Sequence, residues 1–131
     1  MGWKLLEHMT DLFIEASNTS FEKTLEDLAE GMFAHMGGKD AKAVGSFNIE
    51  KKSGTTEGLV VELLSDILAE CEIMGFTPVS LVVNEYKEGE IRATVKGEKK
   101  TLENIIKGVT YHKLEVKEED GKWIMRVLFD I

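Results

Sequence analysis

Two aspartates at opposite ends of the chain, Asp11 and Asp130, are the residues with the clearest potential for chemistry. Asp11 stands where the first strongly apolar run begins, and Asp130 stands where the last one ends. If these runs pair as strands, both carboxylates and the main-chain and terminal carboxylate oxygens of Ile131 gather at one sheet edge. Such an oxygen-rich site suits a hard cation such as Ca²⁺ or Mg²⁺. The residues alone leave open the alternative that both aspartates are solvated strand ends.

Other side chains with chemical potential have ordinary structural explanations. Glu7 and His8, shortly before Asp11, could extend a metal or acid–base cluster or could lie in a surface turn. Cys71 falls on the apolar stripe of a helix, which predicts an inert core thiol. His35 lies near a helix end, where a contact with the helix dipole explains it. The chain has no glycine-rich phosphate loop and no HExxH or GxSxG motif, so no familiar enzyme class is indicated.

Residues 107–131 predict a β-hairpin. Asp120-Gly121 separates two β-rich runs, and this dipeptide favours a type I′ turn, in which both central residues need positive φ. A two-residue turn there sets the register of every later pair and gives one apolar and one polar face. The expected pairs include Glu119–Lys122, Glu115–Arg126, His112–Phe129 and Tyr111–Asp130. This register turns His112 toward the core and places Asp130 on the wetter face, with Lys107 further along it.

Hydrophobic periodicity predicts two helices and a series of strands ahead of this hairpin. Apolar residues at spacings of three and four indicate a helix over residues 21–36, opened by a Thr19/Glu22 capping box and stopped by Gly37-Gly38. A wide apolar stripe indicates a second, deeply buried helix that follows residues 53–56 and ends before Gly75. Strands are expected at residues 12–16, 43–51, 79–86 and 91–95, and residues 3–8 could form an edge strand or an extended lead-in.

The element order β-α-β-α-β-β-β-β predicts an α+β fold for a single domain over residues 1–131. We expect a two-layer sandwich, with two helices packed on one face of a mixed, mainly antiparallel sheet of about six strands. A net charge of −8 argues against a broad grip on nucleic acid or on an anionic membrane, because both need basic patches. One cysteine, no membrane-spanning apolar run and no secretory signal predict a cytoplasmic protein.

Three motifs, in order along the chain, resemble those of the archease family. Residues 7–11 (Glu-His-Met-Thr-Asp) are similar to its opening Glu-His-Thr-Ala-Asp motif, and residues 107–112 (Lys-Gly-Val-Thr-Tyr-His) are similar to its Lys-Ala-Val/Leu-Thr-Tyr-His motif. Residues 127–131 (Val-Leu-Phe-Asp-Ile) resemble its closing Val-x-Phe/Leu-Asp-hydrophobic segment. The departures remove neither carboxylate nor the lysine; they are Met9, Thr10, Gly108 and, in the second helix, Leu63 and Ser65.

The resemblance implies a protein cofactor, not itself a catalyst, that activates the RtcB-type RNA ligase of tRNA splicing. Such a cofactor promotes guanylylation of the ligase, which uses GTP and a divalent metal, and supports multiple turnover. Carried over from the motifs, the metal ligands are Asp11, Asp130 and Ile131, with Ca²⁺ as the expected ion and Mg²⁺ or Mn²⁺ as alternatives. Lys107 is expected to act at the ligase active site. The ligase is the expected partner, RNA is involved only indirectly, and no membrane is expected.

Two other functions stay open at this point. A general chaperone or assembly modulator without metal chemistry would expose an apolar patch and would tolerate Asp11→Ala. A small metal-dependent hydrolase that uses Asp11, Asp130 and either Glu7 or His8 would turn over substrate alone. Against the hydrolase, the sequence offers no convincing nucleophile or general base.

Overall fold

The computed structural model describes residues 1–7 and 11–131. Over these residues the chain forms two α-helices, one short 3-10 helix and seven strands. In chain order the elements are β1 (Gly2–Leu6), β2 (Leu12–Asn18), α1 (Phe21–Ala34), η1 (Gly38–Asp40), β3 (Gly45–Lys52), α2 (Thr56–Met74), β4 (Phe76–Lys87), β5 (Glu90–Lys99), β6 (Gly108–Glu119) and β7 (Lys122–Asp130). The order of elements expected from the sequence is confirmed, and the ambiguous N-terminal segment is the additional strand β1.

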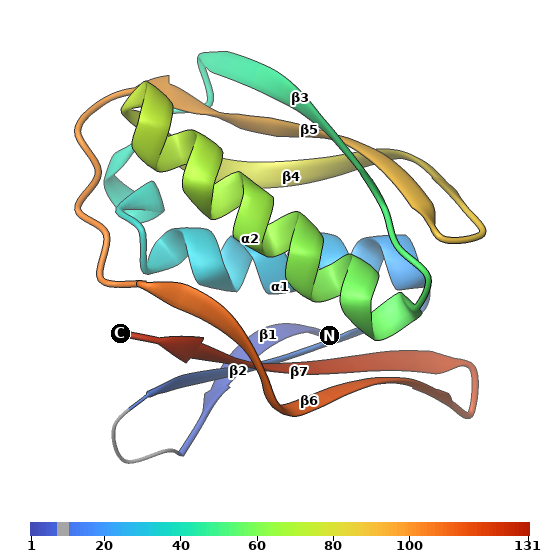
Figure 1. The fold of residues 1–131 in the computed structure, drawn as a ribbon. Coiled ribbons are helices and arrows are strands. Elements are labelled where there is room, and N and C mark those ends of the chain that lie inside the picture. The colour runs from blue at the N-terminus through green and yellow to red at the C-terminus, as the bar shows by residue number, and fades with distance from the viewer. Residues whose placement is uncertain (8–10) are drawn as a thin grey trace.

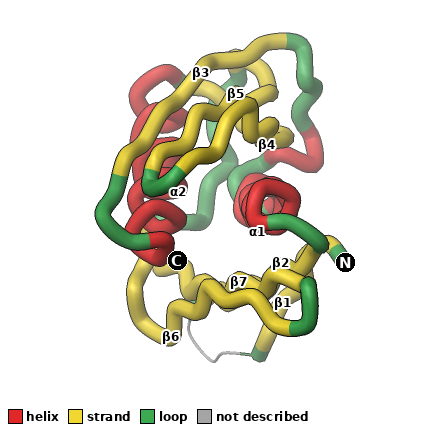
Figure 2. The backbone as a smooth tube through the Cα atoms, turned by 90° about the vertical axis from the view of Figure 1, so that its right-hand side faces the viewer, coloured by secondary structure: helices red, strands yellow, loops and turns green. Residues whose placement is uncertain are grey.

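The strands form two antiparallel sheets on opposite sides of the helices (Figures 1 and 2). Within the described residues, one sheet has the order β1-β2-β7-β6 and the other has the order β3-β5-β4. Helix α1 contacts β2 of the first sheet and β4 of the second, and α2 contacts β6 and β3. The helices are therefore the middle layer of the molecule. In the part of the chain that the structure describes, neither helix is long and apolar enough to cross a membrane.

The α+β sandwich class is confirmed, but the strands are divided between two sheets and do not form the single sheet that we expected. All the strand pairs of the described residues are antiparallel, so neither sheet is mixed. The physical reason lies in α2, which is apolar around much of its circumference and needs cover on more than one side. Its buried residues are Gly58, Leu59, Val60, Val61, Leu63, Leu64, Ile67, Leu68 and Cys71.

Helix α1 is capped one residue later than the sequence indicated. Ser20 is the N-cap, and its Oγ accepts a hydrogen bond from the Lys23 N–H at 3.1 Å. Thr19, which we expected to cap the helix, has its own N–H bonded to Asn18 Oδ1. The serine hydroxyl accepts a hydrogen bond from a first-turn N–H that has no partner within the helix, which is the role expected of the threonine. Capping by a side-chain hydroxyl is therefore confirmed, but the predicted capping box is not, because the residue three positions after Ser20 is Lys23 and not a glutamate.

Helix α2 begins and ends as predicted. Thr55 Oγ1 accepts a hydrogen bond from the Gly58 N–H at 2.9 Å, and the helix stops at Gly75, whose φ of 64° favours glycine. Cys71 is fully buried on this helix, and burial raises the pKa of its thiol to about 12. Because the thiolate is the reactive form of cysteine, this environment agrees with the predicted inert core thiol.

Candidate functional site

Three neighbouring strands, β2, β7 and β6, bring the predicted site residues to one end of the four-stranded sheet (Figure 1). Leu12, the first residue of β2, lies opposite Phe129 of β7, so Asp11 just before β2 and Asp130 just after Phe129 lie at the same end of this strand pair. On the other side of β7, Asp130 lies opposite Gly108 of β6. The two aspartates, which are far apart in the sequence, are therefore brought to the same end of the sheet.

Lys107 adjoins Asp130 through the backbone. The Lys107 N–H donates to the Asp130 carbonyl at 2.7 Å, which ties the start of β6 to the end of β7. Lys107 and Asp130 are exposed, and Ile131 is 43% exposed. Gly108, opposite Asp130, has no side chain that could cover the carboxylate, and a Cβ there would lie 3.9 Å from the Asp130 Cβ. The lysine and the aspartate are thus accessible to a partner.

Strand β6 departs from regular pairing in its middle. Thr110 lies opposite Leu128, whereas Glu115 lies opposite Arg126, so β6 advances five residues while β7 advances two. Within this bulge Lys113 has a φ of 57°, a left-handed conformation that is costly for a residue with a side chain. Strained backbone of this kind is often found at functional sites. The bulge begins directly after residues 108–110, the part of β6 that pairs with the end of β7 next to Lys107 and Asp130.

The bulge corrects two expectations from the sequence. His112 is exposed and does not face the core, and Tyr111, which is 58% exposed, does not lie opposite Asp130. The physical cause is the set of three extra residues in β6, which shifts the pairing of every residue before Glu115 relative to a continuous hairpin.

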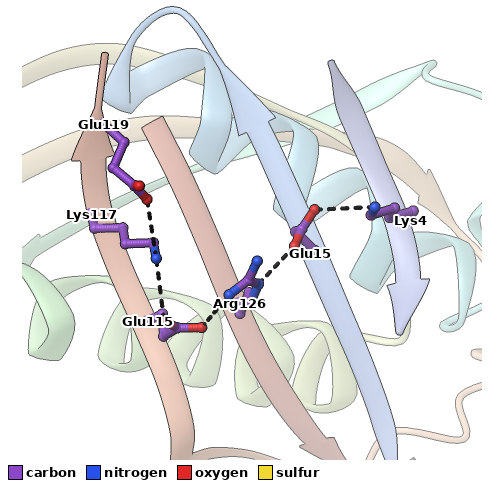
Figure 3. A network of polar contacts seen from close by, with 6 residues as sticks. All are labelled: Lys4, Glu15, Glu115, Lys117, Glu119 and Arg126. Carbon is purple, nitrogen blue, oxygen red and sulfur yellow. Dashed lines mark hydrogen bonds and ion pairs between the residues drawn. The ribbon is translucent and has the colours of Figure 1, made fainter. Parts of the chain in front are cut away.

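A chain of ion pairs spans the outer face of the same sheet (Figure 3). Arg126 of β7 is at its centre, where Nε donates to Glu15 of β2 at 2.7 Å and Nη1 donates to Glu115 of β6 at 2.6 Å. Lys4 lies 3.5 Å from Glu15, and Lys117 lies 3.5 Å from Glu115. The arginine therefore joins the three strands whose ends carry the predicted site residues.

Arg126 lowers the pKa of both glutamates that it binds. Burial alone would raise the pKa of Glu15, but the hydrogen bond and the charge of Arg126, together with Lys4, outweigh burial and lower that pKa. The hydrogen bond from Arg126 is the main cause of the lowered pKa of Glu115. Both carboxylates are therefore ionised in the folded protein at neutral pH.

We expect Arg126→Ala to lower the free energy of unfolding by about 1 kcal/mol at pH 7, because both glutamates lose their shared cation. The pKa values of Glu15 and Glu115 are lower in the folded protein than in the unfolded chain, where a glutamate has a pKa of about 4.3. The stabilisation by Arg126 is therefore fully present above the unfolded pKa and is lost as the pH falls through the pKa values of the folded protein. Urea unfolding at pH 7 and near pH 3 measures the difference between variant and wild type. A difference that does not shrink at the acidic pH contradicts the ionic origin.

The metal ligands that the sequence predicts at this end of the sheet are all oxygens. Among residues 1–7 and 11–131, no group of three or more His, Cys, Asp or Glu side chains is placed to hold a metal ion. His8, a further candidate from the sequence, lies outside the described residues. The ligands that the sequence predicts remain the carboxylates of Asp11 and Asp130 with the main-chain oxygens of Ile131, at the start of β2 and the end of β7. Oxygen donors of this kind fit Ca²⁺, Mg²⁺ or Mn²⁺, and so few protein ligands leave coordination positions open.

His35 and Glu15, which lie away from this end of the sheet, have structural roles. His35 Nδ1 forms a hydrogen bond with the Gly31 carbonyl at 2.8 Å, and its ring meets Trp3 edge-on at 5.9 Å. Glu15, which binds Arg126 from the neighbouring strand, was not among the residues that the sequence singled out. The alternation of β2 could have marked Glu15 as outward-facing, but only the β2–β7 register identifies its partner.

Comparison with protein families identifies the chain. It belongs to the family described as the Archease protein family (MTH1598/TM1083), whose family model matches residues 3–131. The chain is 27% identical over 140 residues to the protein archease of Methanopyrus kandleri, with 100% of both chains covered. It is 30% identical over 149 residues to the protein archease of Methanosarcina mazei, with 98% of this chain and 95% of the relative covered.

Solved structures share the fold. The solution structure of protein 1598 of Methanobacterium thermoautotrophicum superposes with a TM-score of 0.78 at 21% identity and covers 99% of both chains. The crystal structure of an archease and possible chaperone of Thermotoga maritima superposes with a TM-score of 0.70 at 23% identity, covering 98% of this chain and 96% of the other. The sandwich of two sheets around two helices is therefore an architecture that these proteins share.

Proposed function

We propose that this protein activates an RtcB-type RNA ligase in tRNA splicing by promoting ligase guanylylation and multiple turnover. The observation that supports the proposal lies at one end of the four-stranded sheet, where the Lys107 N–H donates to the Asp130 carbonyl and Asp11 directly precedes β2, the neighbour of β7. The three motifs that support the family resemblance contribute these same residues. The protein acts as a cofactor of the ligase and does not itself join RNA.

In this proposal, Asp11, Asp130 and Ile131 hold a divalent cation, with Ca²⁺ as the first candidate and Mg²⁺ or Mn²⁺ as alternatives. The donor chemistry supports this assignment, because carboxylate and main-chain oxygens suit hard cations. A bound cation would supply positive charge that can polarise or neutralise phosphate oxygens. The few protein ligands would allow the ligase or its nucleotide to complete the coordination.

Lys107 is proposed to contact the ligase active site. Its exposed side chain begins next to the Asp130 carbonyl, so it projects from the same end of the sheet. A lysine ammonium is a compact point charge on a flexible stem, which suits the phosphates of a nucleotide. Its role is therefore to hold phosphate charge during guanylylation.

The charge of the protein supports a protein partner and argues against direct RNA binding. A net charge of −8 repels a polyanion but complements the basic surface that a tRNA-binding ligase needs. RNA is then reached only through the ligase.

The test is a single-turnover guanylylation assay with GTP, divalent metal and an RtcB-type ligase from the same organism. The wild-type protein should accelerate guanylylation, and Asp130→Ala or Lys107→Ala should reduce the acceleration at least about tenfold. Glu118→Ala is the matched control, because Glu118 is an exposed carboxylate near the opposite end of the same hairpin. A wild-type protein that does not change the guanylylation rate contradicts the proposed function.

A chaperone is the second candidate, because the Thermotoga maritima relative is named a possible chaperone. This function would suppress aggregation of unrelated proteins and would not need the acidic site. Equal suppression of aggregation by wild type and Asp130→Ala, without any effect on guanylylation, would favour the chaperone.

A further inference from the structure

Strand β3 has an open edge. It is an outer strand of the three-stranded sheet, with β5 on one side, and within the described residues no strand pairs with its other side. The Ser53 N–H donates to the Gly89 carbonyl at 2.8 Å, which continues the β3–β5 register by one pair. Because hydrogen-bonded and non-hydrogen-bonded positions alternate in an antiparallel pair, the main-chain groups of Asn48 and Glu50 point to the open edge.

A groove runs between this edge and helix α2. It has a volume of about 530 Å³ and is lined by residues 47–50 of β3 and by Asp66, Ala69, Glu70 and Met74 of α2. Figure 2 shows α2 beneath β3 on one side of the molecule, and the two elements are in contact. The groove therefore has the strand-and-helix walls that accept an added peptide strand in other folds.

The groove is apolar at one end. A second hollow of about 350 Å³ continues it and shares Phe47 and Met74 as lining residues. Phe76 adds an aromatic ring to this hollow, and the ring of Phe47 meets it edge-on at 5.2 Å. Val44, at the mouth, is 74% exposed. This end of the groove offers apolar contact to a side chain from outside.

The other end of the groove is acidic. Asp66 is paired with Lys51 at 3.1 Å, and Glu50 is paired with Arg92 at 3.4 Å. Glu70 is exposed and has no ion-pair partner among the described residues. The unbalanced charge in the groove is therefore negative, and it complements a lysine or arginine.

We propose that this groove binds an extended basic segment of a partner protein, which adds to β3 as an extra strand. The segment places an apolar side chain near Met74 and a basic side chain near Glu70. A second copy of the chain fits less well, because it would bring the same acidic surface against the groove. The groove belongs to the three-stranded sheet, so this inference does not depend on the function proposed for Asp11, Asp130 and Lys107.

The test uses the full chain and a fluorescent eight-residue peptide. Threonine occupies every other position of the peptide. The four remaining positions carry two valines followed by two lysines in one version, and two lysines followed by two valines in a second version. Anisotropy should show saturable binding that weakens with added salt, and replacing both lysines by glutamate should abolish it. No binding of either lysine peptide to the wild-type protein would overturn the proposal.

Paired variants locate the binding. Asn48→Pro removes a main-chain donor at the open edge, whereas Asn48→Ala keeps it, so only the proline should weaken binding, by about tenfold. Glu70→Lys should weaken binding by a similar factor, whereas Glu30→Lys, the same charge change on the exposed surface of α1, should not. If the two variants of either pair weaken peptide binding equally, the peptide does not bind in the groove. A dimer in sedimentation that Asn48→Pro dissociates would show that the edge pairs with a second copy instead.

Discussion

Asp130→Ala is expected to abolish the stabilisation of this protein by Ca²⁺. If the cation binds only the folded chain, Ca²⁺ at about one hundred times its dissociation constant raises the free energy of unfolding by about 2.7 kcal/mol. For a domain of this size, that corresponds to a rise in melting temperature of about 10 °C. Asp130 supplies one of two side-chain carboxylates, so its loss leaves too few oxygens to compete with water. Thermal unfolding with and without Ca²⁺ measures the effect.

Two further variants separate ligand binding from general charge. Glu118→Ala removes an exposed carboxylate elsewhere on the hairpin and should leave the Ca²⁺ shift intact. Lys107→Ala removes a neighbouring positive charge and should preserve or increase the shift, although the proposed function expects this variant to activate the ligase less. If neither Ca²⁺, Mg²⁺ nor Mn²⁺ raises the melting temperature of the wild type, the free protein has no cation site. Since unfolding needs no ligase, this readout tests the cation site apart from the proposed activity.

Gly97→Ala is expected to destabilise the fold by about 3 kcal/mol. Gly97 is buried in β5 opposite Pro78 of β4, and a Cβ there would collide with the carbonyl oxygen of Thr77. The same Cβ would lie 2.9 Å from the Pro78 Cα and 2.8 Å from Cε1 of the Phe76 ring. Two of these three neighbours are backbone atoms, which cannot move aside by changing rotamer. Guanidinium unfolding at 25 °C measures the loss.

Gly54→Ala is the control for this substitution. A Cβ at Gly54 would meet no atom within 4 Å, so the free energy of unfolding should change by less than about 0.5 kcal/mol. Similar stability losses in the two variants would mean that chain flexibility, and not the collision at Gly97, sets the cost.

The hairpin shows how far local sequence signals reach. Asp120 and Gly121 have φ values of 52° and 75°, as a type I′ turn requires, and the predicted pairing of Glu115 with Arg126 is confirmed. For residues before Glu115 the predicted register is wrong, because a bulge adds three residues to β6 and the pattern of apolar and polar residues does not show it. Lys113 carries the unusual φ of that bulge, and lysine is not a residue that signals one.

The assembly of the sheets depends on contacts that no local pattern encodes. The apolar circumference of α2 indicated deep burial, but not whether one sheet or two would cover it. The position of Asp11 and Asp130 at opposite ends of the chain suggested that they could meet. What brings the start of β2 beside the end of β7 is the β2–β7 register, in which Ile14 and Val127 are paired and both buried.

The central position of β7 has a consequence for synthesis on the ribosome. β7 lies between β2 and β6, so a nascent chain that still lacks it has two strands with no partner between them. The four-stranded sheet can close only after residue 130 has emerged, and long-range pairing of this kind is slow to form. A prematurely terminated chain that lacks β7 therefore loses the strand that joins β2 to β6, and it never brings Asp130 to the end of the sheet where Asp11 lies. A partner that recognises this pair would engage only molecules whose translation has passed that point.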